Sequence, residues 1–143
     1  ITWVARAAAA VTPRQQQVFD TVKQARDLIV DRLLADWERG ERVEGWQLDQ
    51  LARDLITDAG YGDRLLHRTG HSLSPGPAVH GLGANLDCVE SHDSRALLPG
   101  TGFTIEPGVY LDDFGVRLEV DVYVDPDRGP LVTTPLQDDI ILL

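Results

Sequence analysis

Two glutamates in apolar surroundings are the first residues of this chain that suggest chemistry. Glu106 and Glu119 lie in runs that read as strands, Gly102 to Tyr110 and Val116 to Val124. A lone carboxylate is costly to bury among apolar neighbours, so a partner must compensate its charge. A salt bridge to Arg117 or a solvated face of the sheet would do so. A metal cation is the alternative, and it requires further ligands.

Histidines that can act as such ligands lie upstream, in the segment Leu66-His67-Arg68-Thr69-Gly70-His71. Two imidazoles four residues apart, with a glycine between them, are expected to lie close together. Neutral imidazole combined with carboxylate oxygens suits Mn, Fe, Co or Zn better than Ca. One histidine and the two glutamates therefore predict a partial metal site.

The elements that must position these residues are a hairpin and two helices. Leu111 to Gly115 carries an acidic pair and a glycine, which suits a tight turn between the two strand runs. Thr12 and Pro13 predict a helix start, from which apolar residues at helical spacing continue to about Trp37.

A second amphipathic helix is expected over residues 48–59, with Gly60 as its stop. The segment from Ser72 to Pro99 is rich in Gly, Pro, Ser and Asn, and loops of this length often border functional sites. The order helix, helix, strands predicts an α+β fold in which the two helices cover an antiparallel sheet.

Composition excludes several classes of function. The 143 residues suit one domain, with 43% hydrophobic and 25% charged residues. The net charge of −10 argues against nucleic acid as a partner, and no apolar run is long enough to cross a membrane. The single cysteine, Cys88, excludes an internal disulfide framework and fits the cytoplasm, and it is interpreted as structural or incidental.

Four motifs in fixed order give this pattern its specificity: HRTGH at 67–71, His80, FTIEPGVY at 103–110 and GVRLE at 115–119. With them the chain resembles the pita-bread metallopeptidases, a family that includes prolidase, aminopeptidase P, methionine aminopeptidase and the metal-free creatinase. The resemblance implies part of the pita-bread fold, with two amphipathic helices on a curved antiparallel sheet. Arg117, two residues before Glu119, marks the prolidase and aminopeptidase P branch.

The resemblance also implies roles for individual residues. His71 and Glu106 would bind one metal, Glu119 would bridge two metals, and Glu106 would also handle a proton. His67 and His80 would contact the peptide and stabilise the oxyanion, although a packed or solvated histidine remains the alternative for each. Arg117 and His80 would bind the substrate.

The implied reaction is hydrolysis of the peptide bond before proline in Xaa-Pro dipeptides or short peptides. It would use two divalent cations, Mn first, with Co, Zn or Fe as alternatives, which activate water and polarise the scissile carbonyl.

The chain departs from the family pattern between His71 and His80. The link from Ser72 to Val79 is about two residues longer than usual, which we expect to displace His80 by several ångströms. His92 matches no motif and is expected at the surface.

The beginning of the chain predicts that residues 1–143 are the C-terminal portion of a metallopeptidase catalytic domain. The sequence contains no methionine and opens with the apolar run Ile1-Thr2-Trp3-Val4. In the family, the second of two aspartate ligands typically precedes such a segment, so both aspartates are expected to be absent here. We therefore expect this chain alone to be inactive and, with apolar surface exposed, to form a homo-oligomer.

Two other functions remain open at this point. A non-catalytic module used for binding or assembly is favoured by the absent aspartates and the longer link, and is opposed by the retained His71, Glu106 and Glu119. A metal-free, creatinase-like hydrolase would have no reason to keep all three ligands.

Overall fold

Both helices begin at a capped end. In the computed structural model, which describes residues 1–143, helix α1 spans Pro13–Glu38 and helix α2 spans Gly45–Asp58. The Thr12 hydroxyl accepts from the Gln15 backbone N–H at 3.3 Å, and the Gln15 side-chain oxygen accepts from the Thr12 N–H at 3.1 Å. The predicted start of α1 is thus confirmed, and its end lies one residue beyond the predicted one. Past α2, Gly60 has a φ of +89°, the left-handed conformation that commonly ends a helix.

The strands are short and form three separate sheets. Ten elements follow one another along the chain, including a 3-10 helix at Gly62–Arg64: β1 (Ala5–Arg6), α1, α2, the 3-10 helix, β2 (Gly102–Ile105), β3 (Gly108–Tyr110), β4 (Gly115–Arg117), β5 (Val120–Asp125), β6 (Gly129–Val132) and β7 (Ile141–Leu142). Strands β2, β5 and β6 form an antiparallel sheet, β3 pairs antiparallel with β4, and β1 pairs parallel with β7.

The structure divides each of the two predicted strand runs in two. The pairing β2–β5 ends at Ile105 and Val120, and the pairing β3–β4 begins again at Gly108 and Arg117. Pro107 lies in the gap and has no N–H to donate to a ladder. The predicted hairpin is therefore present, but its ladder is interrupted where the two glutamates lie.

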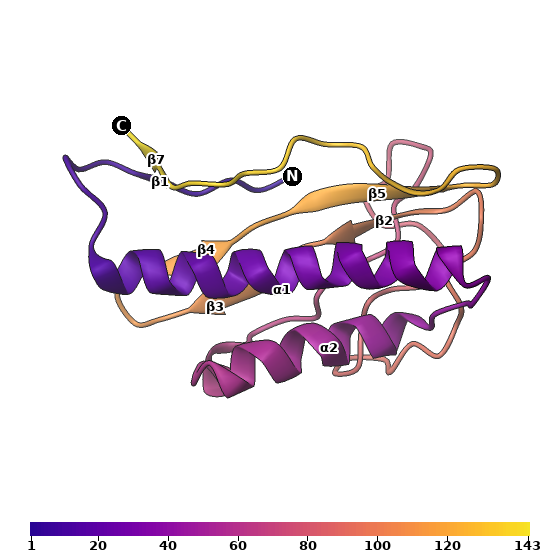
Figure 1. The fold of residues 1–143 in the computed structure, drawn as a ribbon, viewed down its shortest axis with the longest axis horizontal. Helices are drawn as coiled ribbons and strands as arrows, with labels where there is room; N and C mark the ends of the chain where they lie inside the picture. The colour runs from indigo at the N-terminus through magenta and orange to yellow at the C-terminus, as the bar shows by residue number, and fades with distance from the viewer.

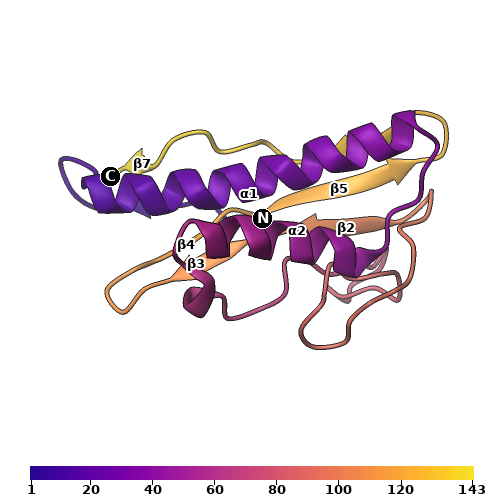
Figure 2. The same ribbon diagram turned by 60° about the horizontal axis from the view of Figure 1, so that its bottom comes forward.

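The two helices lie side by side and cover the sheets. Figures 1 and 2 show α1 running along the strands, with α2 beside it. The buried core lies between these layers and consists of apolar side chains from both helices, the long loop and the strands: Val18, Phe19, Val22, Ala25, Ile29, Leu33, Val43, Leu48, Ala52, Ile56, Ala84, Leu86, Leu97, Phe103, Ile105, Val109, Val116, Leu118, Val120, Val122 and Val124. This arrangement confirms the predicted α+β class.

Strand β1, near the start of the chain, pairs in parallel with β7, near its end, at one edge of the molecule (Figure 1). Neither helix combines the length and the hydropathy that a membrane-crossing segment needs.

Candidate metal centre

Glu106 and Glu119 lie opposite one another in the gap between the two ladders. Glu106 directly follows β2, and Glu119 directly precedes β5, whose first residue Val120 pairs with Ile105. The two side chains are only 12% and 13% exposed. The interruption of the ladder thus places two mostly buried carboxylates on neighbouring strands at the same level.

His71 reaches this gap because its segment runs along the free edge of β2. The Thr104 N–H donates to the His71 carbonyl at 2.9 Å, and the Glu106 N–H donates to the Thr69 carbonyl at 2.7 Å. Gly70 lies between these two bonds, and a Cβ there would lie 2.0 Å from the Thr104 carbonyl oxygen. The glycine between the two histidines therefore permits the close approach that aligns His71 with Glu106.

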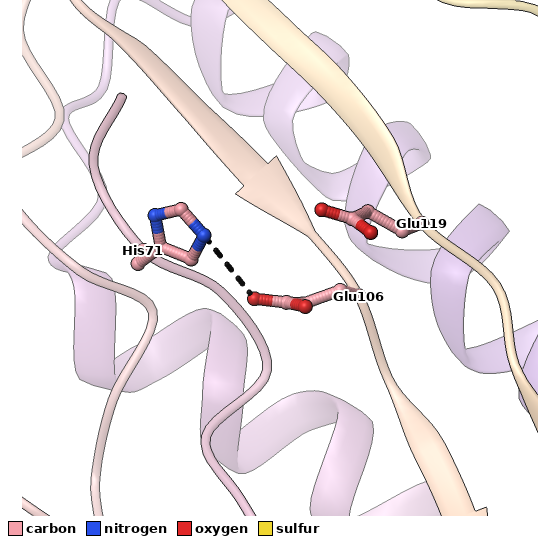
Figure 3. Close-up of side chains that lie close together, drawn as sticks. All are labelled: His71, Glu106 and Glu119. Carbon is pink, nitrogen blue, oxygen red and sulfur yellow. Dashed lines mark ion pairs between the residues drawn. The ribbon is translucent and has the colours of Figure 1, made fainter. Parts of the chain in front are cut away.

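The side chains of His71, Glu106 and Glu119 converge on one point (Figure 3). One ligand atom of each lies within 4.8 Å of the others, and His71 Nε2 lies 3.6 Å from Glu106 Oε1. Two atoms that each lie about 2.0–2.2 Å from a shared metal ion are separated by roughly 3–4 Å. The spacing of His71 and Glu106 therefore fits joint coordination of one ion.

The imidazole of His71 is held in the tautomer that metal binding requires. Its Nδ1 lies 3.0 Å from the Ser72 carbonyl oxygen, which can only accept a hydrogen bond, so the proton is assigned to Nδ1. Nε2 then turns a free lone pair towards Glu106. Metal-binding histidines usually donate their other N–H in this way, and the donor set fits a divalent cation.

Arg117 and two threonines surround the carboxylates. Thr104 Oγ1 donates to Glu106 Oε1 at 3.2 Å, and Thr2 Oγ1 donates to Glu119 Oε2 at 2.6 Å. Arg117 Nη1 lies 3.6 Å from Glu106 Oε2, while its Nη2 donates to Thr2 Oγ1 at 2.9 Å. The salt bridge considered from the sequence is thus present, and it leaves the carboxylate oxygens nearest His71 facing the gap.

These groups line an open pocket of about 410 Å³ that has no hydrophobic side chain in its wall. All six predicted site residues line it, together with Arg68 and Glu90: His67, His71, His80, Glu106, Arg117 and Glu119. The volume and the polar wall suit a small, hydrophilic ligand.

The expected displacement of His80 is wrong. Its ring centroid lies 4.2 Å from that of His71, although the link between them is long. Leu73 pairs with His80 in an isolated bridge, and the Ser74 N–H donates to the Val79 carbonyl at 3.3 Å. The extra residues therefore bulge outwards in a closed loop, and His80 stays at the exposed mouth of the pocket.

His67 is held by both of its ring nitrogens. Its Nδ1 lies 2.6 Å from the Arg68 carbonyl oxygen, so this nitrogen carries the proton, and Nε2 accepts from the Tyr110 hydroxyl at 2.7 Å. Burial raises the pKa of Tyr110, which keeps the hydroxyl protonated as a donor. The imidazole of His67 thus lines the pocket in a fixed orientation.

Sequence reasoning did not identify three residues that contact the site: Thr2, Thr104 and Tyr110. Thr104 had a signal, since residues two apart in a strand project to the same face as Glu106. His92 is exposed and stacks on Trp46 with 4.9 Å between ring centroids, which confirms its predicted surface position. Cys88 is a free thiol.

Comparison with known proteins identifies relatives over most of the chain. The model of metallopeptidase family M24 matches residues 1–126. An Xaa-Pro dipeptidase of Lactobacillus helveticus is 35% identical over 117 residues, which are 80% of this chain and 28% of that protein.

Two solved structures have the same fold. A prolidase from Thermococcus sibiricus has a TM-score of 0.79 and 30% identity, and the match covers 97% of this chain and 34% of that one. An X-Pro aminopeptidase from Thermotoga maritima has a TM-score of 0.76 and 26% identity, covering 98% of this chain and 35% of that one. These likenesses confirm the predicted partial pita-bread fold. The chain spans about a third of the length of the relatives it matches.

Proposed function

Since this chain belongs to metallopeptidase family M24, we propose that the full-length protein hydrolyses the peptide bond before proline in dipeptides or short peptides. The observation that carries the proposal is the convergence of His71, Glu106 and Glu119 within 4.8 Å at a wholly polar pocket. The relatives named Xaa-Pro dipeptidase and prolidase support this substrate class.

The proposed metal ligands are the three convergent side chains. His71 and Glu106 would hold one divalent cation, and Glu119 would contribute to both cations of the pair, with Mn as the preferred metal. When bound, the two cations supply Lewis acidity towards the scissile carbonyl and lower the pKa of an attacking water. Three side chains cannot fill the coordination of two ions, so we propose that two aspartates outside residues 1–143 complete the site.

The remaining pocket residues act on the substrate. The exposed imidazole of His80, at the pocket mouth beside His71, is available to donate a hydrogen bond to the carbonyl oxygen as negative charge develops there. Glu106 accepts a proton from the attacking water and returns it to the leaving nitrogen. Arg117, 3.6 Å from Glu106, keeps that carboxylate oriented, and its remaining donors bind the substrate. His67, which lines the same pocket, contacts the peptide.

Hydrolysis by the full-length protein tests the proposal. Metal-free protein is supplied with Mn and offered Ala-Pro and Gly-Pro, with Ala-Ala as the control that lacks proline. We expect Mn-dependent hydrolysis of both proline dipeptides, loss of turnover in Glu106→Gln, and little hydrolysis of Ala-Ala. Binding of the dipeptides without turnover, with every divalent metal tried, would contradict the proposed enzyme activity and favour a non-catalytic binding module.

Assembly and location belong to the same proposal. We propose that the protein forms a homo-oligomer and acts in the cytoplasm, where a free thiol such as Cys88 stays reduced. Residues 1–143 alone are expected to lack turnover because the ion site is incomplete. Light scattering of the full-length protein would contradict the assembly if it gave a monomer mass.

A further inference from the structure

A buried carboxylate outside the pocket holds the histidine segment in place. Asp49 of α2 is 0% exposed, yet its charge is matched by four hydrogen-bond donors. Its Oδ1 accepts from the backbone N–H of Thr69, at 2.9 Å, and from the Thr69 hydroxyl. Its Oδ2 accepts from Arg53 Nε at 3.0 Å and from the Cys88 N–H at 2.7 Å. Both oxygens of this buried carboxylate are therefore hydrogen-bonded.

The histidine segment, residues 67–71, is hydrogen-bonded to Asp49 through Thr69 and has no regular secondary structure of its own. Helix α2 holds it on one side, since Arg53 Nη2 also donates to the His67 carbonyl at 2.6 Å. The residue that follows β2 holds it on the other side, since the Glu106 N–H donates to the Thr69 carbonyl. Thr69 is thus the residue through which the helix and the glutamate are connected.

We propose that Asp49 is a positioning residue for the metal centre. By holding both donors of Thr69, it fixes the register of the histidine segment against β2, and hence the distance from His71 Nε2 to Glu106. This role rests on the proposed metal site. It is carried by a path of three direct contacts: Asp49 to Thr69, Thr69 to the Glu106 backbone, and Glu106 to His71.

Asparagine at position 49 cannot replace the carboxylate, for a geometric reason. A carboxylate presents two acceptor oxygens, whereas an amide presents one oxygen and one NH₂ group. Whichever way the amide is turned, its NH₂ faces a backbone N–H that can only donate, either that of Thr69 or that of Cys88. Thr69→Val removes only the hydroxyl donor at nearly constant volume, and Thr69→Ser keeps it.

The test is calorimetric titration of the metal-free, full-length protein with MnCl₂, which requires no substrate. We expect Asp49→Asn and Thr69→Val to bind Mn about 10- to 100-fold more weakly than the wild type, and Thr69→Ser to bind within about threefold. Asp54→Asn makes the same chemical change on the exposed face of α2 and is expected to bind normally. Val22→Ala, in the core of α1, controls for lost stability alone.

Wild-type Mn affinity in both Asp49→Asn and Thr69→Val would overturn the inference. The inference would also be overturned if Val22→Ala, destabilised to the same extent as Asp49→Asn, lost the same amount of Mn affinity. The effect would then come from general destabilisation. Should Asp49→Asn fail to fold, the comparison of Thr69→Val with Thr69→Ser decides alone. Failure of proline-dipeptide hydrolysis in a protein that binds Mn normally would count against the proposed function and leave this inference standing.

Discussion

Replacing Gly70 by alanine should break the alignment between the histidine segment and β2. The added Cβ would lie 2.0 Å from the Thr104 carbonyl oxygen and 3.0 Å from its carbon. Contacts of a Cβ below 3.0 Å are essentially absent from real proteins, so the two backbones must separate by about 1 Å. Both contacts are with backbone atoms, and no side-chain rotation relieves them.

The cost of Gly70→Ala follows from the hydrogen bonds on either side. Those from Thr104 N to the His71 carbonyl and from Glu106 N to the Thr69 carbonyl are 2.9 and 2.7 Å long. A separation of about 1 Å stretches both beyond hydrogen-bonding distance. The loss of two hydrogen bonds, which leaves backbone N–H and C=O groups partly unsatisfied, lowers the free energy of unfolding by about 2–3 kcal/mol. A 1 Å misplacement of His71 would also lower catalytic activity by about 100-fold.

Urea unfolding and dipeptide hydrolysis of the full-length protein measure the two effects. Gly76→Ala is the matched control, since a Cβ there meets only the Ser74 hydroxyl oxygen at an ordinary 3.6 Å. The reasoning is refuted if Gly70→Ala, like Gly76→Ala, keeps wild-type stability and activity within threefold.

Three further predictions concern other parts of the chain. Hydrogen bonding to Arg95 lowers the pKa of Asp93 to about 2, so its carboxylate stabilises the fold above pH 4, and this contribution disappears as the pH falls towards 2. Asp93→Asn should lower the free energy of unfolding at pH 7 by about 1–2 kcal/mol. The free energy of unfolding of this variant should also depend less on pH between 4 and 2. Partial burial, reinforced by Asp49, raises the pKa of Cys88 to about 12, so iodoacetamide at pH 8 should modify it at least about 100-fold more slowly than free cysteine. Comparable rates would contradict this prediction. Thr12→Ala removes the cap of α1 and should cost about 1 kcal/mol in thermal unfolding, whereas Thr12→Ser should cost little.

The helices could be predicted because their signals are local. The cap at Thr12 and the apolar spacing behind it define α1 without reference to the rest of the chain. Residue chemistry indicated that one histidine and the two glutamates could share a site, but the choice of His71 depended on the resemblance to a family. Residues so far apart in sequence carry no geometric signal of their own. The interrupted ladder had a local signal in Pro107, whose missing N–H already argued against a continuous strand.

The supporting contacts could not be predicted because they depend on tertiary packing. Asp49 occupies a buried position of α2 beside Leu48 and three residues before Ala52, and a charged residue on an apolar stripe signals an unknown partner. That partner, Thr69, lies 20 residues away on a segment without regular structure. The position of His80 was mispredicted for a related reason. The length of the link from Ser72 to Val79 does not show whether its extra residues close into a loop.

The most direct test of the account is the number of Mn ions bound per chain of the full-length protein, measured for the wild type, His71→Ala and Glu119→Gln. If Glu119 bridges two ions and His71 binds one, the wild type should bind two ions tightly. His71→Ala should then lose one of them, and Glu119→Gln should weaken both. Unchanged stoichiometry and affinity in the two variants would show that the three convergent side chains do not form the metal centre.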